Sequence, residues 1–197
     1  MMKLIRCLAF AAIFTPLSAG AQDFDAGLRA FDSGDYATAL QEWRPLAEQG
    51  HAWSQYALGA MYELGQGVLQ DYAEAVRWYR AAAEQGDPYA QTNLGVMYLN
   101  GHGVAQDYAE AARWYRAAAE QGIPKAQANL GAMYGLGLGV AQDYVSAHMW
   151  SNIAAAAGNE IGHEQRELAA SLMTADAIAE AQRRARICMA SDYQDCD

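Results

Sequence analysis

The sequence has 197 residues, of which 53% are hydrophobic, and its formal net charge is −10 at pH 7. This excess of negative charge is repelled by nucleic acid and by anionic lipid surfaces, so it excludes a protein that works mainly by binding either. For the same reason we expect a partner that is neutral or basic. After residue 21 no apolar run is long enough to cross a bilayer, so we expect no integral membrane segment.

The N-terminus, residues 1–21, is typical of a cleavable signal peptide. Lys3 and Arg6 precede an apolar run from Cys7 to Leu17, and the small residues Ala19-Gly20-Ala21 follow. We predict cleavage after Ala21 and a periplasmic or secreted protein; the alternative is a buried N-terminal helix. Cleavage leaves 11 basic and 23 acidic residues, so the net charge becomes −12.

The rest of the chain repeats itself. The segments GQGVLQDYAEAVRWYRAAAEQG and GHGVAQDYAEAARWYRAAAEQG start 36 residues apart, at Gly65 and Gly101, and differ at three positions. The same period aligns an Asp-Tyr pair near residues 35, 71, 107 and 143. We therefore predict four helix-pair repeats in residues 22–158, at about 24–50, 51–86, 87–122 and 123–158.

Each unit contains signals for two helices. An Asp followed three residues later by Glu, as in Asp107 and Glu110, is a helix start, and Gly122 marks the end, so we predict a helix of about fourteen residues from Tyr108 to Gln121. Its apolar positions form one buried stripe: Ala111, Ala112, Tyr115, Ala118 and Ala119. A shorter helix, AQTNLGVMYLNG, precedes it, and the glycine in its middle indicates close contact between helices.

The Gly-x-Gly-Val segments between the two helices predict tight turns with positive backbone angles. They do not predict a phosphate-binding loop, because no strand precedes them and no Gly-Lys-Ser/Thr follows. The Trp-Tyr pairs that begin at Trp78 and Trp114 have helical spacing and are assigned to the core. We therefore expect no cofactor.

The first and last units differ from the middle ones. In the first, Pro45 predicts a bend near Arg44. In the fourth, Met149 and Asn152 replace two arginines of the third unit, which indicates a covered surface. Residues 159–197 contain two further amphipathic segments, which we predict to form a C-terminal capping helical hairpin followed by a short tail.

The mature chain keeps two cysteines, Cys188 and Cys196, in an oxidising compartment. A disulfide between them would pin the C-terminal tail. Free thiols and a bond to a partner chain are the alternatives, and the absence of Cys-x-x-Cys gives no sign of a thioredoxin-type redox site.

From Ala90 through Gly122 the sequence reads Ala-x3-Leu-Gly-x2-Tyr-x2-Gly-x-Gly-Val-x2-Asp-Tyr-x2-Ala-x2-Trp-Tyr-x2-Ala-Ala-x2-Gly. This pattern resembles the Sel-one-like repeat (SLR) family, which is related to the tetratricopeptide repeats, and the resemblance covers about residues 24–158. It implies an all-α fold, a right-handed superhelical solenoid of antiparallel helix pairs. It also implies a non-catalytic scaffold or regulator that binds a protein or peptide and so could regulate an envelope protein.

In the family, the first helix of each pair lines a concave groove where ligands bind. The resemblance transfers that role to twelve positions of this chain: Trp53, Tyr56, Ala57, Ala60, Tyr89, Thr92, Asn93, Val96, Lys125, Ala128, Asn129 and Ala132. Exposed aromatic rings and amides suit the recognition of an extended peptide. Alternatively, Trp53 and Tyr56 only pack on the first unit, or the binding site lies on the convex face.

A hydrolase acting on β-lactam or cell-wall substrates is the alternative from a different class, because cysteine-rich relatives have been proposed to act on penicillins. Those relatives carry a cysteine pair in every repeat, and the repeats of this chain contain none. The mature chain also lacks a Ser-x-x-Lys nucleophile, because its only lysine, Lys125, has no serine three residues before it. The four histidines lie in different units and never recur at helical spacing, so we predict no metal site.

Overall fold

The computed structural model describes residues 23–196, so the predicted signal peptide lies outside the described residues. This range contains ten α-helices and no strand. The helices are α1 (Phe24–Asp32), α2 (Tyr36–Glu48), α3 (Ala52–Leu64), α4 (Tyr72–Glu84), α5 (Pro88–Asn100), α6 (Tyr108–Ala119), α7 (Pro124–Leu136), α8 (Tyr144–Ala156), α9 (Glu160–Ser171) and α10 (Ala175–Ala190).

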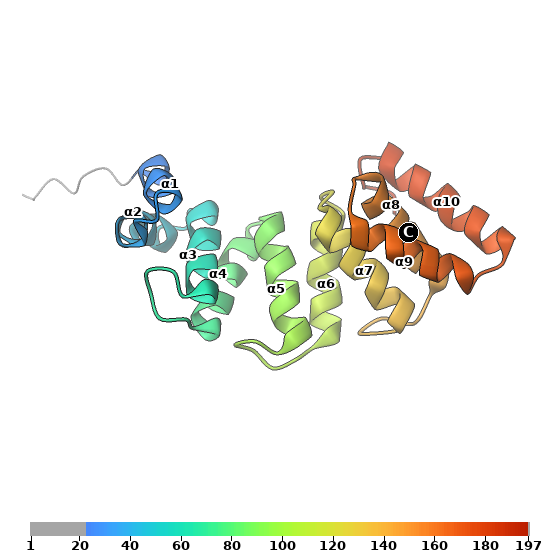
Figure 1. Ribbon diagram of the computed structural model, residues 1–197, viewed down its shortest axis with the longest axis horizontal. Helices are drawn as coiled ribbons and strands as arrows, with labels where there is room; N and C mark the ends of the chain where they lie inside the picture. Colours follow the sequence, from blue (N-terminus) through green and yellow to red (C-terminus); the bar gives the residue numbers. More distant parts are fainter. Residues whose placement is uncertain (1–22, 197) are drawn as a thin grey trace, which may run out of the picture.

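The helices stack as pairs into an elongated solenoid, with α1 and α2 at one end and α9 and α10 at the other (Figure 1). The pairs are α1 with α2, α3 with α4, α5 with α6 and α7 with α8, and the second helix of each of the first three pairs packs against the first helix of the next pair. Each pair buries its apolar face only against its neighbours, as in other repeat proteins. The all-α solenoid expected from the sequence is confirmed.

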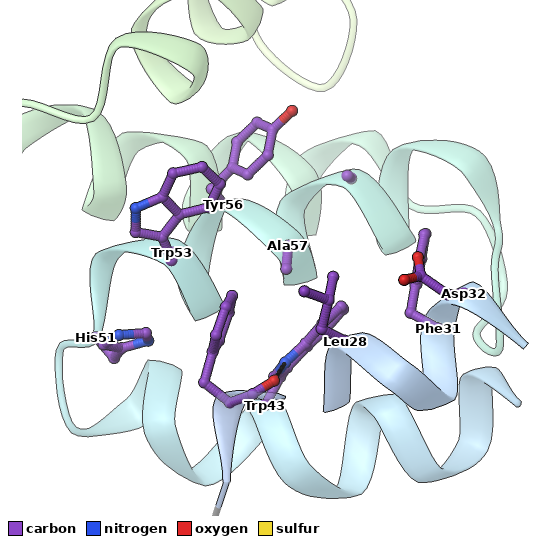
Figure 2. A pocket seen from close by; sticks show the side chains of 10 residues that line it. Leu28, Phe31, Asp32, Trp43, His51, Trp53, Tyr56 and Ala57 are labelled. Carbon is purple, nitrogen blue, oxygen red and sulfur yellow. Dashed lines mark hydrogen bonds between the residues drawn. The ribbon is translucent and has the colours of Figure 1, made fainter. Parts of the chain in front are cut away.

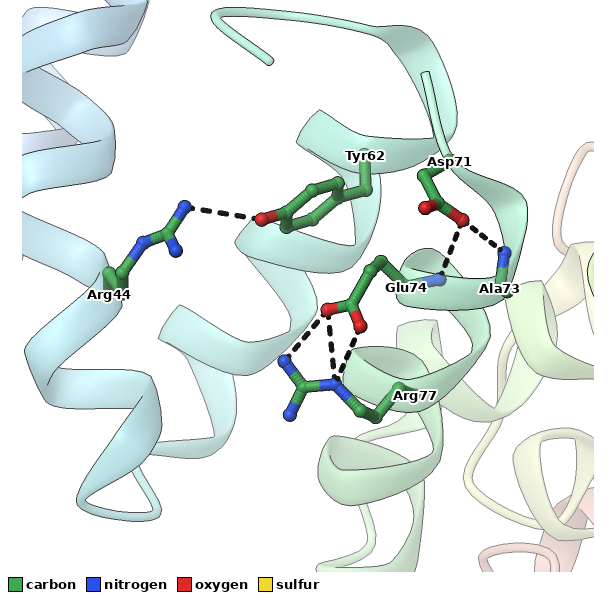
Figure 3. Close-up of polar contacts among 6 residues, drawn as sticks. All are labelled: Arg44, Tyr62, Asp71, Ala73, Glu74 and Arg77. Carbon is green, nitrogen blue, oxygen red and sulfur yellow. Dashed lines mark hydrogen bonds and ion pairs between the residues drawn. The ribbon is translucent and has the colours of Figure 1, made fainter. Parts of the chain in front are cut away.

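An aspartate caps the second helix of each unit. Asp71 Oδ1 accepts hydrogen bonds from the backbone N–H groups of Ala73 and Glu74, at 2.9 and 3.1 Å (Figure 3). The Glu74 carboxylate does not turn back to the cap, because it pairs with Arg77 at 2.8 Å. The Asp71 N–H donates instead to the carbonyl of Tyr62 at 3.0 Å, which ties the start of α4 to α3.

The helix ends differ slightly from those expected. In the second, third and fourth units the first helix of the pair is not shorter than the second: α5 and α7 have 13 residues each and begin at Pro88 and Pro124. Proline is favoured at the first helical position because its fixed φ suits the helix and its missing N–H has no partner there. Helix α6 ends at Ala119, two residues before the expected Gln121, and a turn closed by the Gly122 N–H and the Ala119 carbonyl (3.0 Å) follows.

The Gly-x-Gly turns need both glycines. Gly101 ends α5 with a φ of +70°, a conformation that costs other residues energy. A Cβ on Gly103 would overlap the backbone of Tyr72 in the preceding unit. The positive backbone angles predicted for the turn are present, and the segment also makes a tight contact between units.

Aromatic rings from each second helix fill the core of the middle units. Tyr79 and Tyr115 are fully buried, and Trp78 and Trp114 are 6% and 7% exposed. The predicted apolar stripe of α6 is buried along its whole length. The assignment of the Trp-Tyr pairs to the core is confirmed.

A buried glutamine on the first helix of the second, third and fourth units joins each of these units to the one before it. Gln91 Nε2 donates to the carbonyl of Ala83 at 3.2 Å, and equivalent bonds come from Gln55 and Gln127 in the units before and after. Gln91 Oε1 in turn accepts from Gln121 of the same unit at 2.8 Å. These bonds give a second donor to carbonyls at the C-terminal ends of the second helices, each of which also accepts a turn hydrogen bond from a glycine N–H at 3.0 Å.

The C-terminal helices cover the fourth unit. Met149 is 1% exposed, and Asn152 accepts a hydrogen bond from Arg166 of α9 at 3.4 Å, so the predicted covered surface is present. Helix α9 packs on α7 and α8, and α10 packs on α8 from another side. The two capping helices therefore contact α8 more than they contact each other.

At the opposite end, α2 continues through Pro45 as a single helix.

A disulfide joins Cys188 at the end of α10 to Cys196 in the tail. The loop between them folds back on the solenoid, where Tyr193 packs against the buried cluster that contains Ala118 and Ala119. A Cβ on Gly122 would come within 2.8 Å of the Tyr193 ring. The tail therefore covers the turn between α6 and α7.

Candidate binding groove

Three aromatic side chains gather on the first helices of the second and third units. Trp53 of α3 and Tyr89 of α5 are 50% and 47% exposed, and Tyr56 lies half-buried between them. The ring centroids are 6.0 Å apart for Trp53 and Tyr89 and 6.1 Å apart for Tyr56 and Tyr89. Such rings give a large contact area with few rotatable bonds, which is typical of residues that dominate binding.

A mostly apolar hollow of about 540 Å³ opens beside these rings, between α1 and α3 and above α2 (Figure 2). Its lining includes Leu28 and Phe31 of α1, Trp43 of α2, and Trp53 and Tyr56 of α3. The charged residue of the lining is Asp32. The hollow has the size and composition of sites that accept an apolar group.

A hydrogen bond and ring contacts hold together the residues that line the hollow. Trp43 Nε1 donates to the Phe24 carbonyl at 3.1 Å, and the Phe24 and Trp43 rings stack with centroids 5.8 Å apart. Trp53 also contacts Phe24, at 6.5 Å between centroids. Trp53 therefore packs on the first unit, but packing is not all it does, because half of its surface stays open to solvent.

A serine and a histidine lie next to each other at the edge of the hollow, where the histidine caps the start of α3. His51 Nδ1 lies 2.8 Å from Ser54 Oγ and accepts from the Ser54 backbone N–H at 3.3 Å. Ser54 is completely buried. A nucleophile must reach its substrate, so this pair is not arranged for hydrolysis.

Polar groups of α5 lie close to these aromatic side chains. Asn93 is half-buried and lies beside the hydroxyl groups of Tyr56 and Tyr79. Burial raises the pKa of both tyrosines, and for Tyr79 the neighbouring Glu63 raises it further because the Tyr79 hydroxyl donates to Glu63 Oε2 at 2.6 Å. Burial also raises the pKa of Asp87, the cap of α5.

In the fourth unit, polar side chains of α7 stand at the positions equivalent to Tyr89 and Asn93. Lys125 is exposed, and Asn129 is half-buried beside the buried hydroxyl of Tyr115. Thr92 and Ala128 do not belong to this surface, because they are 3% and 2% exposed. Thr92 Oγ1 donates to the Pro88 carbonyl at 2.8 Å, so its side chain serves its own helix.

The α1 residues of the hollow were not foreseen from the sequence. Phe24, Leu28 and Phe31 have helical spacing, which was a usable signal. However, α1 precedes the repeated pattern, so no register linked it to the groove.

Within residues 23–196, no group of three or more His, Cys, Asp and Glu side chains is placed to hold a metal ion. None of the helices described for that range is both long and apolar enough to cross a membrane.

The Sel1 repeat matches this sequence three times, at residues 54–87, 88–123 and 124–159. This chain belongs to the Sel1 repeat family. The three matches coincide with the units built on α3 to α8, and Sel1 repeat proteins generally mediate protein–protein interactions. A comparison with curated proteins found no match.

Two solved structures resemble this Sel1 repeat protein. A Sel1 repeat protein from Oxalobacter formigenes is 32% identical, with a TM-score of 0.70, over 74% of this chain and 60% of its own. The protective antigen c5321 of uropathogenic Escherichia coli, which has an SLR fold, is 30% identical, with a TM-score of 0.61, over 86% of this chain and 46% of its own. The alignments thus span less than two thirds of either relative.

Proposed function

We propose that this Sel1 repeat protein is a non-catalytic scaffold or regulator that binds an extended segment of a partner protein along α3, α5 and α7. The observation that carries the proposal is the continuity of the half-exposed rings of Trp53 and Tyr89 with the 540 Å³ hollow. A large apolar side chain of the partner would enter the hollow, and its neighbours would lie across the rings.

The polar residues of the groove fit the backbone of such a segment. The amides of Asn93 and Asn129 lie 36 residues apart in the sequence, at the same position of consecutive units, and each can bond a peptide group. The net charge of −12 expected for the mature chain favours a neutral or basic segment. Lys125, the exposed lysine of α7, would meet an acidic group or a C-terminus at the far end.

We place this activity in the periplasm, where the partner would be a secreted protein or the external part of an envelope protein. The predicted signal peptide and the Cys188–Cys196 disulfide support this location, because disulfides persist in oxidising compartments. Regulation of an envelope protein is one form that the scaffold role can take.

The test is affinity capture from an envelope extract followed by quantitative mass spectrometry. The bait is the purified protein, compared with a groove variant, Trp53→Ala with Tyr89→Ala, and a control variant, Leu69→Ala with Tyr108→Ala. The control residues are 92% and 36% exposed and lie outside α3, α5 and α7. We expect the groove variant alone to lose its partner, with affinity for that purified partner falling at least about tenfold.

Equal capture by all three baits would place the site elsewhere, with the convex face as the next candidate. Turnover of nitrocefin or of peptidoglycan fragments by the purified protein would contradict the non-catalytic part of the proposal. Retained circular dichroism in each variant shows that the fold has survived the substitutions.

A further inference from the structure

An aromatic ring lies on a glycine of the first helix in each of the first three units. Tyr79 covers Gly59 and Tyr115 covers Gly95, so a Cβ on either glycine would come within 2.6 or 2.7 Å of the ring. Trp43 covers Gly27 in the same way. The ring thus closes the space between the two helices of its unit.

The fourth unit keeps the glycine and lacks the ring. Ser151 of α8 stands 36 residues after Tyr115, and a Cβ on Gly131 would meet Ser151 Oγ at 2.5 Å. The serine is much smaller than a tyrosine, so its side chain does not fill the space that the ring fills elsewhere. The α8 backbone closes part of that space, because Ala147 O and Ser151 N lie 3.1 and 3.2 Å from the same Cβ position.

A hollow of about 340 Å³ lies next to this contact and is lined mainly by residues of α7, α8 and α9. We call it the Ser151 pocket. Its inner wall includes Gly131, Gly135, Ala147 and Ser151, and three exposed leucines stand among its lining residues. These are Leu136, Leu168 and Leu172, with exposed fractions of 68%, 65% and 57%.

Two polar atoms of the lining are buried and unpaired. Ser151 is 1% exposed, and neither its Oγ nor the Oε1 of Gln165 has a hydrogen-bond partner among the described residues. Leaving such groups unpaired costs free energy, so a group that bonds them is favoured in the pocket. Gln165 Oε1 requires a donor, and the serine hydroxyl can donate or accept.

We propose that the Ser151 pocket binds one phenol ring, the group of a tyrosine side chain. The ring lies next to the position that Tyr79 and Tyr115 occupy in their units, against Gly135 and Ala147. Its hydroxyl donates to Gln165 Oε1 and accepts from Ser151, and the leucines contact whatever carries the ring. This site lies at the opposite end of the solenoid from the hollow at Trp53 (Figure 1), and it stands independently of the function proposed above.

The experiment titrates p-cresol, the side-chain analogue of tyrosine, into ¹⁵N-labelled protein and follows the backbone amides. We expect saturable shifts centred on Gly131, Gly135 and Ser151, and weaker binding of toluene, which lacks the hydroxyl. Ser151→Tyr fills the pocket with its own ring and should weaken p-cresol at least about tenfold. Ser151→Ala keeps the space, so toluene should still bind while the preference for p-cresol shrinks.

The controls separate pocket loss from misfolding. Ser151→Ala and Ser151→Tyr must keep the helical circular dichroism of the parent, and Trp53→Ala, at the other end, must leave the p-cresol shifts at Ser151 unchanged. No saturable shift would mean that the pocket holds only water and would overturn the proposal. Shifts that persist in Ser151→Tyr, or toluene binding as tightly as p-cresol to the parent, would do the same.

A further titration with N-acetyl-tyrosinamide identifies the source of the ring. Tighter binding than p-cresol indicates a tyrosine side chain of a partner, because the added backbone groups reach the leucines at the rim. Weaker binding indicates a free small phenol, because the backbone groups then clash with that rim.

Discussion

The ring of Tyr115 lies on the backbone of Gly95, and a Cβ at position 95 would come within 2.7 Å of the ring atom Cε1. Tyr115 is fully buried, so its ring cannot turn away. This contact explains why a glycine, which is unfavourable inside a helix by about 1 kcal/mol relative to alanine, stands in the middle of α5.

Gly95→Ala should therefore destabilise the protein by about 1 to 3 kcal/mol, because overpacking outweighs the gain in helix propensity. The matched control is Gly135→Ala on α7, where the nearest atom would be Ala147 Cβ at 3.6 Å, an ordinary contact. That change should stabilise by roughly 0.5 to 1 kcal/mol. Urea unfolding measures both, and equal effects of the two substitutions would contradict the packing argument.

Two tyrosines in the same register have different hydroxyl environments. The Tyr79 hydroxyl donates to Glu63 at 2.6 Å. The Tyr115 hydroxyl, although Asn129 lies beside it, makes no hydrogen bond within the described part of the chain, because Leu99 stands where the previous unit has Glu63.

Tyr79→Phe should thus cost about 1.5 to 3 kcal/mol, the range for a hydrogen bond to a charged group. Tyr115→Phe removes an unpaired buried hydroxyl, so its effect should stay within about 0.5 kcal/mol or be slightly stabilising. The free energies of unfolding from denaturant titrations test the pair. A larger loss for Tyr115→Phe than for Tyr79→Phe would show that its hydroxyl has a partner of its own.

Much of the fold could be predicted because its determinants are local or repeat at a fixed period. Asp71 caps its helix through amides two and three residues away, and Gly101 ends its helix through its own backbone angle, so neither depends on distant contacts. The predicted segment AQTNLGVMYLNG starts at Ala90, two residues after the start of α5, although a proline such as Pro88 is a recognised start of a helix.

The exposure of the candidate groove side chains was predictable at one position of the repeat but not at another. Trp53, Tyr89 and Lys125 share one position of the repeat, and all three are exposed. Tyr56 and Thr92 share another, yet only the tyrosine reaches the surface, because the shorter threonine ends inside the helix contact. Exposure at that position thus depends on side-chain length, which a periodic pattern does not contain.

A buried histidine should make stability depend on pH. His148 of α8 is 2% exposed, and its pKa is lowered by burial and then by the charge of Arg166, with Glu167 acting in the opposite direction. Between the lowered folded pKa and the unfolded value of about 6.5, the unfolded chain binds a proton that the native protein does not. Stability from this group is therefore lost as the pH falls through that range.

We expect the urea midpoint to fall between about pH 7.5 and about pH 5.5, and the fall to be smaller in His148→Val. Valine is the residue at this position in the second unit, Val76, so it suits the helix contact. A variant with the same pH dependence as the parent would assign the effect to other groups.

The disulfide should stabilise the C-terminal cap. Cys188 and Cys196 are eight positions apart in the sequence, and closing so short a loop contributes about 2 to 3 kcal/mol in the chain-entropy model. Since Tyr193 lies inside this loop and packs on the turn at Gly122, opening the bond should also release the tyrosine from the end of α6.

Reduction by dithiothreitol should therefore lower the urea midpoint and raise the exposure of Tyr193. The same reagent should leave the urea midpoint of a Cys188→Ala, Cys196→Ala variant unchanged. Identical midpoints for the oxidised and reduced parent would mean that packing of the tail alone holds the cap closed.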